Sequence, residues 1–230
     1  MFHWFTWHNK NSLKDFDLWI GKLPKITRAP ERYEEVKIPG RAGSLILLEG
    51  DDVYDSYEKE CTVITRNTNP KLQEALEWLR GSGDVVFSNE IEKAYEARII
   101  APVEFARIGN SLLQAKIVFF CEPLKKSIAE DQLTFTASGS IINRGDVASK
   151  PIVSITATGN RTITIGGTAM TLKNLSGTVD VDCDAGIITK NGALWTEEVT
   201  GDFWRIPKGQ SAVTLPESTS ITIQPRWRWV

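Results

Sequence analysis

The chain has 230 residues, a hydrophobic fraction of 41%, a charged fraction of 24% and a formal net charge of −2. These values are typical of a folded globular protein with room for two modest cores, and they exclude an extensively disordered or fibrous chain. Proteins that bind nucleic acid usually have a basic face, and the small negative net charge does not indicate one. We therefore expect no sequence-specific binding of DNA or RNA.

The cysteines and the apolar runs indicate where the chain folds. Cys61, Cys121 and Cys183 are odd in number and lie far apart in apolar strand patterns, which predicts buried free thiols and a reducing compartment. The N-terminal segment lacks the basic and apolar regions of a secretory signal, and no stretch reaches the roughly 20 apolar residues of a membrane span. Synthesis in a cytoplasm, without membrane insertion, is therefore expected.

The first predicted strand covers residues 2–8 and carries aromatic rings on both of its faces. Such a strand is expected to be covered on both sides, either in a sandwich core or by another subunit. The histidines of this strand, His3 and His8, lie on opposite faces without a nearby cysteine or carboxylate, so we expect no zinc site. A second short strand is predicted at residues 16–20. The aromatic residues of the first predicted strand, at residues 2–8, are Phe2, Trp4, Phe5 and Trp7.

A β-hairpin is predicted between residues 32 and 48. Residues 33–38 alternate with the period of a half-buried strand and end at Pro39-Gly40, with a second glycine three residues after Gly40. Proline fixes its own φ and glycine accepts a positive φ, so the chain reverses around Arg41. It leaves the turn as a run of four apolar residues. Spacing alone is typical of an ordinary hairpin with a charged tip.

One amphipathic helix is predicted over about residues 70–80. Asn69 suits the N-cap, Pro70 suits the first helical position, and Gly81 follows as a stop. The apolar residues between them fall on one face, which is expected to pack into a core. Strands are predicted around this helix at residues 61–65, 84–87, 95–100 and 112–121.

The order of these elements resembles a known family. An aromatic first strand, the motif Ile38-Pro39-Gly40-Arg41-x-Gly43-x-Leu45, one helix and a final long strand closed by aromatic-Cys-x-Pro are similar to the N-terminal domain of phage distal tail proteins. In that family the domain is a β-sandwich with one helix, and copies of it close into a hexameric ring. The resemblance implies such a ring-forming domain over residues 1–127.

The second half changes in composition after a polar run at residues 127–132, which is interpreted as a linker. Many short strands and tight turns, among them Gly166-Gly167, predict an all-β sandwich. Asp180, Asp182 and Asp184 have the spacing of an EF-hand start. The glycine that follows comes one position too late and no helices flank the loop, so this pattern is interpreted as a solvated strand face and no metal is expected.

This half is similar to the C-terminal domain of the same family, whose fold resembles galectins and carbohydrate-binding modules. The matching motifs are Asn143-x-Gly145, Lys150-Pro151-Ile152, the Asp-x-Asp-Cys strand, Phe203-x-x-Ile206-Pro207-x-Gly209 and the terminal Arg-Trp-Arg-Trp. The resemblance therefore implies a mainly β chain in which a galectin-like β-sandwich over residues 128–230 follows the N-terminal sandwich. A galectin-like fold does not bring a sugar site with it, because function lies in site residues.

The motifs of enzymes are missing from the sequence. It holds no nucleophile with a base, no paired carboxylates on one face, no metal cluster and no phosphate-binding loop. We therefore expect no enzymatic activity, no catalytic residue, no metal and no cofactor, and no small-molecule ligand is assigned.

The resemblance implies a structural subunit of the phage tail hub. Its copies would form a homo-hexameric ring, single or stacked, that joins the tail tube to the tail-tip adhesion apparatus. The implied partners are the tail tube, tape-measure and tail-associated tip proteins, and the implied location is the virion tail tip after assembly in the bacterial host cytoplasm. A ring needs heterologous contacts that close on themselves. The candidate interface residues are Phe2, Trp4, Phe5, Trp7, Pro39, Gly40 and Arg41.

The alternative is a carbohydrate-binding module that recognises the host cell surface through the C-terminal domain. Aromatic and basic residues are interleaved in the terminal strand, with Trp227 and Trp229 on one face, which is a pattern that binds sugars or single-stranded nucleic acid in other proteins. Two rings on one strand are more often sandwich core. The structural subunit is therefore the preferred hypothesis.

Overall fold

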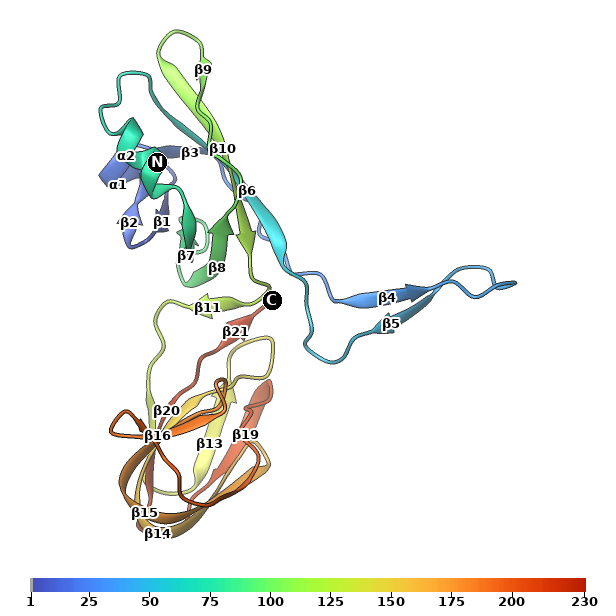
Figure 1. The fold of residues 1–230 in the computed structure, drawn as a ribbon, viewed down its shortest axis with the longest axis vertical. Helices are drawn as coiled ribbons and strands as arrows, with labels where there is room; N and C mark the ends of the chain where they lie inside the picture. The colour runs from blue at the N-terminus through green and yellow to red at the C-terminus, as the bar shows by residue number, and fades with distance from the viewer. Residues whose placement is uncertain (1) are drawn as a thin grey trace. The chain divides into compact units, whose positions relative to one another are not determined.

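The protein is built almost entirely of β-strands in two compact units (Figure 1). The computed structural model describes residues 2–230. One unit comprises the described residues up to Ile128 together with Val230, and the other comprises Ala129–Trp229. Each unit has its own hydrophobic core. The mainly β, sandwich-like architecture predicted from the sequence is confirmed.

The first unit is a curled antiparallel sheet with the strand order β2-β1-β7-β8-β10-β6-β3. The long strands β6 and β10 pair along their full length, and an isolated bridge between His3 and Ile20 brings the start of the chain against β3. The sheet therefore closes around its core. The strands of this unit are β1 (Phe5–Trp7), β2 (Lys10–Asn11), β3 (Trp19–Lys22), β4 (Tyr33–Val36), β5 (Leu45–Leu48), β6 (Tyr57–Arg66), β7 (Gly81–Phe87), β8 (Lys93–Ile99), β9 (Ala106–Ile108), β10 (Leu112–Cys121) and β11 (Lys125–Ser127).

Aromatic rings fill the centre of the first unit. Phe5 and Phe87 each lie 5.6 Å from Phe119 between ring centroids, and Phe5 also stacks on Trp78 at 5.5 Å. Aromatic pairs in such geometries contribute about 0.5–1.5 kcal/mol each beyond the area that they bury. The core of this unit is therefore anchored by residues from four different elements.

A helix, α1 (Ser12–Phe16), stands where the sequence predicted the beginning of a strand at residues 16–20. The side-chain oxygen of Asn11 accepts hydrogen bonds from two backbone N–H groups of its first turn, both at 3.0 Å, and Asp17 ends it in the left-handed conformation. An N-cap of this kind stabilises even a short helix. The strand begins only at Trp19, so its predicted start was wrong.

The predicted helix over residues 70–80 is present as α2 (Leu72–Trp78) and is shorter at both ends. Asn69 makes a different contact from the one expected. Its side-chain oxygen accepts from the Lys71 N–H at 2.9 Å and its amide nitrogen donates to the Phe16 carbonyl at 2.8 Å, so it closes a turn before the helix and holds α1.

Neither helix described within residues 2–230 has the length and apolar character that a membrane span requires.

The second unit is organised around one long hairpin. β14 (Ile152–Ile165) and β15 (Thr168–Asp182) pair along their length and are joined by the tight turn predicted at Gly166-Gly167. The sheet has the order β12-β20-β14-β15-β16-β17, with β13, β18 and β19 added at its sides. The other strands are β12 (Leu133–Phe135), β13 (Gly139–Asn143), β16 (Ile187–Lys190), β17 (Ala193–Leu194), β18 (Val199–Gly201), β19 (Gly209–Thr214), β20 (Ser220–Gln224) and β21 (Arg228–Trp229).

The three cysteines are free and buried, as predicted. Burial raises the pKa of Cys121 to about 12 and that of Cys183 to about 12, and it also raises the pKa of Cys61. A thiol with a raised pKa holds its proton at neutral pH and is a poor nucleophile. All three residues therefore act as small apolar side chains of the two cores.

The aromatic core predicts a clear difference between two phenylalanines of the N-terminal segment. Phe5 is completely buried, whereas 64% of Phe2 is exposed. Phe5→Ala should lower the free energy of unfolding of the first unit by about 3–5 kcal/mol because it leaves a cavity among the rings. The matched variant Phe2→Ala should cost less than about 1 kcal/mol. Calorimetric unfolding of both variants checks this, and equal losses would contradict the packing described.

Candidate interaction surfaces

The N-terminal aromatic residues divide between the core and the surface. Phe5 and Trp7, both predicted as interface candidates, are completely buried in the first unit, so their side chains offer no surface to a neighbouring molecule. Trp4 is half-buried, and Phe2 is exposed with its ring 5.6 Å from that of Trp19. Of the four aromatic candidates, Phe2 and Trp4 are therefore the ones with side-chain surface that a neighbouring molecule could contact. Side-chain alternation alone could not show which rings the curled sheet encloses.

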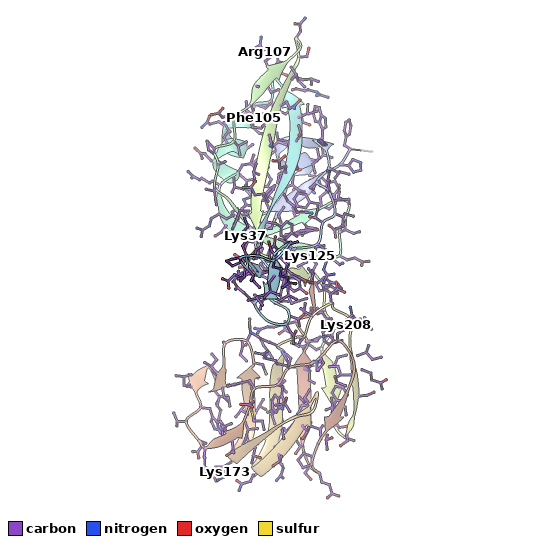
Figure 2. The ribbon with its side chains drawn as sticks, turned by 90° about the vertical axis from the view of Figure 1, so that its right-hand side faces the viewer. Lys37, Phe105, Arg107, Lys125, Lys173 and Lys208 are labelled. Atoms are coloured by element: carbon purple, nitrogen blue, oxygen red, sulfur yellow. The ribbon has the colours of Figure 1, made fainter. Side chains whose placement is uncertain are left out.

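The predicted hairpin is present as β4 and β5, a two-stranded sheet separate from the larger one (Figure 1). Pro39, Gly40 and Arg41 lie in its turn and are all exposed, and the Arg41 N–H donates to the Ile38 carbonyl at 3.2 Å. Lys37 is exposed beside this turn (Figure 2). The turn residues predicted from the sequence thus lie at the accessible tip of the hairpin.

The strand β5 is apolar on both of its faces. The register places Ile46 and Leu48 with Tyr33 on one face, and Leu45 and Leu47 on the other. Three of the four β5 side chains are exposed, and Leu48 is 61% exposed. An apolar strand of this kind normally lies under cover on both sides. β5 is not among the interface candidates predicted from the sequence, although four consecutive apolar residues after a turn are a signal for one.

Polar contacts hold the two ends of the hairpin together. Arg32 Nε donates to Asp55 Oδ1 at 2.7 Å, and the Arg32 N–H donates to the Val53 carbonyl at 3.0 Å. The hydrogen bond that Arg32 donates to Asp55 raises the pKa of the Arg32 guanidinium above its ordinary value. These contacts therefore hold together the two chain segments at the base of the hairpin.

A buried polar cluster lies next to the segment that enters the hairpin. Lys59 is 3% exposed, and its Nζ donates to the Lys25 carbonyl at 2.6 Å and lies 4.5 Å from the Tyr95 ring centroid. Lys125 Nζ lies 3.6 Å from Glu90 Oε1, and the Tyr95 hydroxyl donates to the other Glu90 oxygen. Burial lowers the pKa of Lys59. The cluster therefore fixes the chain at Lys25.

Asp180 and Asp182 of β15, and Asp184 just after this strand, each have a partner within the protein. Asp180 accepts from the Ser154 hydroxyl at 2.5 Å, and Lys150 Nζ lies 2.9 Å from Asp184. Asp182 accepts two hydrogen bonds from Arg226, at 2.8 and 2.9 Å. Across residues 2–230 there is no group of three His, Cys, Asp or Glu residues that could hold a metal ion. The spacing that resembles a calcium loop is thus used for internal hydrogen bonds.

The two histidines lie in different surroundings. The ring of His3 lies 3.3 Å from the Ser88 hydroxyl through Nδ1, and Nε2 of His8 lies 3.2 Å from the Arg80 carbonyl. The two imidazole rings therefore contact different parts of the first unit and do not face a common point.

Two acidic residues hold the C-terminal segment of the second unit. Arg226 has a φ of 54°, and its N–H donates to Glu130 Oε2 at 2.7 Å. Its guanidinium donates hydrogen bonds to the Asp182 carboxylate. The hydrogen bonds from Arg226 lower the pKa of Asp182. Burial raises the pKa of Glu130, and hydrogen bonds from the backbone N–H groups of Arg226 and Trp227 partly oppose that rise. Trp227 belongs to the core of this unit and Trp229 packs against it, in line with the core interpretation.

The Asp182–Arg226 pair predicts a pH-dependent difference. Asp182→Asn keeps the oxygen that caps the Asp184 and Ala185 N–H groups but removes the charge. Because the pKa of Asp182 is lowered in the folded protein, its contribution is present above its unfolded pKa of about 3.9 and is lost as the pH falls through the folded value. We expect the variant to lose about 1 kcal/mol at neutral pH, since the pair is partly screened by solvent.

Unfolding measured at pH 7 and at pH 3 and below checks this, and the difference between the parent and Asp182→Asn should shrink with falling pH. Asp184→Asn, which removes one exposed ion pair to Lys150, is the control and should have little effect at either pH. A constant difference for Asp182→Asn would contradict the assignment.

Comparison with solved structures adds evidence for the fold of the whole chain. No protein-family model and no curated protein sequence matches the chain. The crystal structure of the SPP1 Dit protein, described as a paradigm of the hub adsorption apparatus in phages that infect Gram-positive bacteria, matches with a TM-score of 0.77. The match covers 100% of both chains at 15% sequence identity. The chain therefore has the Dit-like fold of a phage distal tail protein, as the resemblance of its motifs implied.

Proposed function

We propose that this protein is a structural subunit of a phage tail hub. The supporting observation is the structural match over the full length of both chains, which includes both β units and leaves no part of either chain unmatched. The matched protein is a hub component. The work of such a subunit is assembly, and the buried thiols and internally paired carboxylates described above give no support to catalysis.

The proposed assembly is a closed homo-hexameric ring, single or stacked, that joins the tail tube to the tail-tip apparatus. The tail tube, tape-measure and tail-associated tip proteins are the proposed partners, and the virion tail tip is the proposed location. Each copy in a ring offers one face to the next copy and a different face to the previous one. The hairpin is the best candidate for one of these faces because β5 exposes apolar side chains that a neighbouring copy would cover.

Burial of the exposed apolar side chains of β5 would favour a contact between subunits. Covering a Leu or Ile side chain contributes about 1.5–3 kcal/mol, so the apolar residues of β5 together could supply a substantial part of a subunit contact. The ion pair between Arg32 and Asp55 at the base of the hairpin restricts its conformation, so less conformational entropy is lost when the contact forms. Phe2, Trp4 and the turn residues Pro39, Gly40 and Arg41 remain proposed as further contacts.

Leu48→Asp tests the ring and the role of the hairpin together. The purified parent chain should have six times the mass of one chain, or a multiple of this, in light scattering. Leu48→Asp should keep its melting temperature, because Leu48 is 61% exposed, but should shift the mass toward that of one chain since a charge would be buried in the contact.

Leu194→Asp is the matched control, with the same substitution at a leucine of the second unit that is 69% exposed. It should assemble like the parent chain. A parent chain that stays monomeric at all concentrations would count against the ring, whereas rings formed equally well by Leu48→Asp would count against the hairpin alone.

A further inference from the structure

A hollow in the second unit lies along β14 where this strand has no partner on one edge. β20 pairs with β14 as far as the Thr156–Ser220 pair, and β19 pairs with it only from the Thr164–Thr214 pair onward. Between these points β14 has a register shift at Gly159/Arg161 against β15. Within the described part of the chain, no strand covers the other edge of that stretch, and a hollow of about 490 Å³ opens there. The hollow is open to solvent, and its volume is in the range of small-molecule sites, about 300–1,000 Å³.

Arg161 is the charged residue among those that line the hollow. The Nη1 group of Arg161 donates to the carbonyl of the neighbouring Asn160 at 2.9 Å, but its Nε is buried and has no hydrogen-bond partner. Among residues 2–230 the Arg161 guanidinium forms no ion pair. A buried N–H without an acceptor is unfavourable, and a bound acceptor would recover that loss. An arginine fork is best satisfied by a carboxylate or phosphate group.

The rest of the lining is rich in hydroxyl groups. Thr136, Thr156, Thr158, Ser218 and Ser220 are among its residues, and the Thr156 hydroxyl pairs with that of Thr178 at 2.8 Å. Hydroxyls both donate and accept hydrogen bonds, as the hydroxyls of a sugar do. No acidic side chain and no aromatic ring is part of the lining, so neither a cation nor a neutral sugar held by ring stacking suits this site.

We propose that this hollow binds a sugar or polyol that carries one carboxylate or phosphate group. The Arg161 guanidinium donates to the oxyanion, and the surrounding threonine and serine hydroxyls contact the hydroxyls of the ligand. This inference concerns the second unit alone and does not depend on ring assembly through the hairpin. The carbohydrate-binding alternative considered above relied on the tryptophans of the last strand. The site proposed here lies elsewhere in the same unit and relies on a charged group and on hydroxyl groups.

Titration calorimetry on the full chain tests the proposal with four probes: glucuronate, glucose 6-phosphate, uncharged glucose and inorganic phosphate. Glucuronate or glucose 6-phosphate should bind about tenfold or more tightly than both glucose and inorganic phosphate, because only the charged sugars satisfy the arginine and the hydroxyls at once. Glucuronate and glucose 6-phosphate distinguish a carboxylate source of the charge from a phosphate source.

Arg161→Gln should weaken that binding by about tenfold or more, and Arg161→Lys should also weaken it because lysine keeps the charge but loses the fork. Thr158→Val tests the hydroxyl contact and should weaken binding without changing the charge. Arg205→Gln, at an exposed arginine of the same unit that does not line the hollow, is the matched control and should bind like the parent.

The proposal is overturned if neither charged sugar binds, if inorganic phosphate binds as tightly as glucose 6-phosphate, or if Arg161→Gln binds as well as Arg205→Gln. Melting temperatures of all variants show whether a loss of binding comes from unfolding. If Arg161→Gln unfolds, Arg161→Lys and Thr158→Val decide the question.

Discussion

The burial of apolar side chains on one face of each long strand is the constraint on which both units depend. β6 and β10 direct their inward residues to one aromatic core, and β14 and β15 direct theirs to a second core. Each unit meets this requirement with its own residues. β5 is the exception, because its apolar residues lie on both faces and the chain itself leaves most of them uncovered. We propose that assembly uses this uncovered strand, because apolar surface exposed to water is stabilised when another molecule covers it.

Polar contacts decide where the uncovered strand is held. Lys59 reaches through the interior of the first unit to the Lys25 carbonyl, and Arg32 joins the outgoing chain to Asp55. A buried ammonium group is weak evidence for stability because its desolvation opposes the bonds that it forms. Its more credible role is to select one path for the chain ahead of the hairpin. Apolar burial therefore builds the body of the unit, and a few charged groups position the part that is available for contact.

Much of the fold could be predicted from the sequence because strand alternation and turn residues are local properties. The hairpin around Pro39 and the turn at Gly166-Gly167 were predicted for this reason. α1 was missed because five residues are too few to show a helical period, although the Asn11 cap was visible in the sequence. Alternation also could not show that the curled sheet encloses Phe5 and Trp7 while leaving Phe2 outside.

The candidate sites were less predictable because they arise from tertiary structure. Lysine is normally a surface residue, so nothing in the local sequence indicated that Lys59 is buried. The hollow beside Arg161 exists because β19 and β20 meet β14 at separated points, which depends on pairings between distant segments. The tip residues Pro39, Gly40 and Arg41 could be selected from the turn motif, whereas the exposure of β5 became evident only when the hairpin was seen as a separate sheet.

We propose that the surface of one copy covers the hairpin of another. Electron microscopy of the purified full-length chain tests this most directly, because it shows the symmetry of any assembly and the surroundings of β4 and β5. We expect closed rings with six-fold symmetry in which Ile46 and Leu48 lie against a neighbouring copy. Single particles without neighbours, or rings in which the hairpin remains uncovered, would contradict the claim.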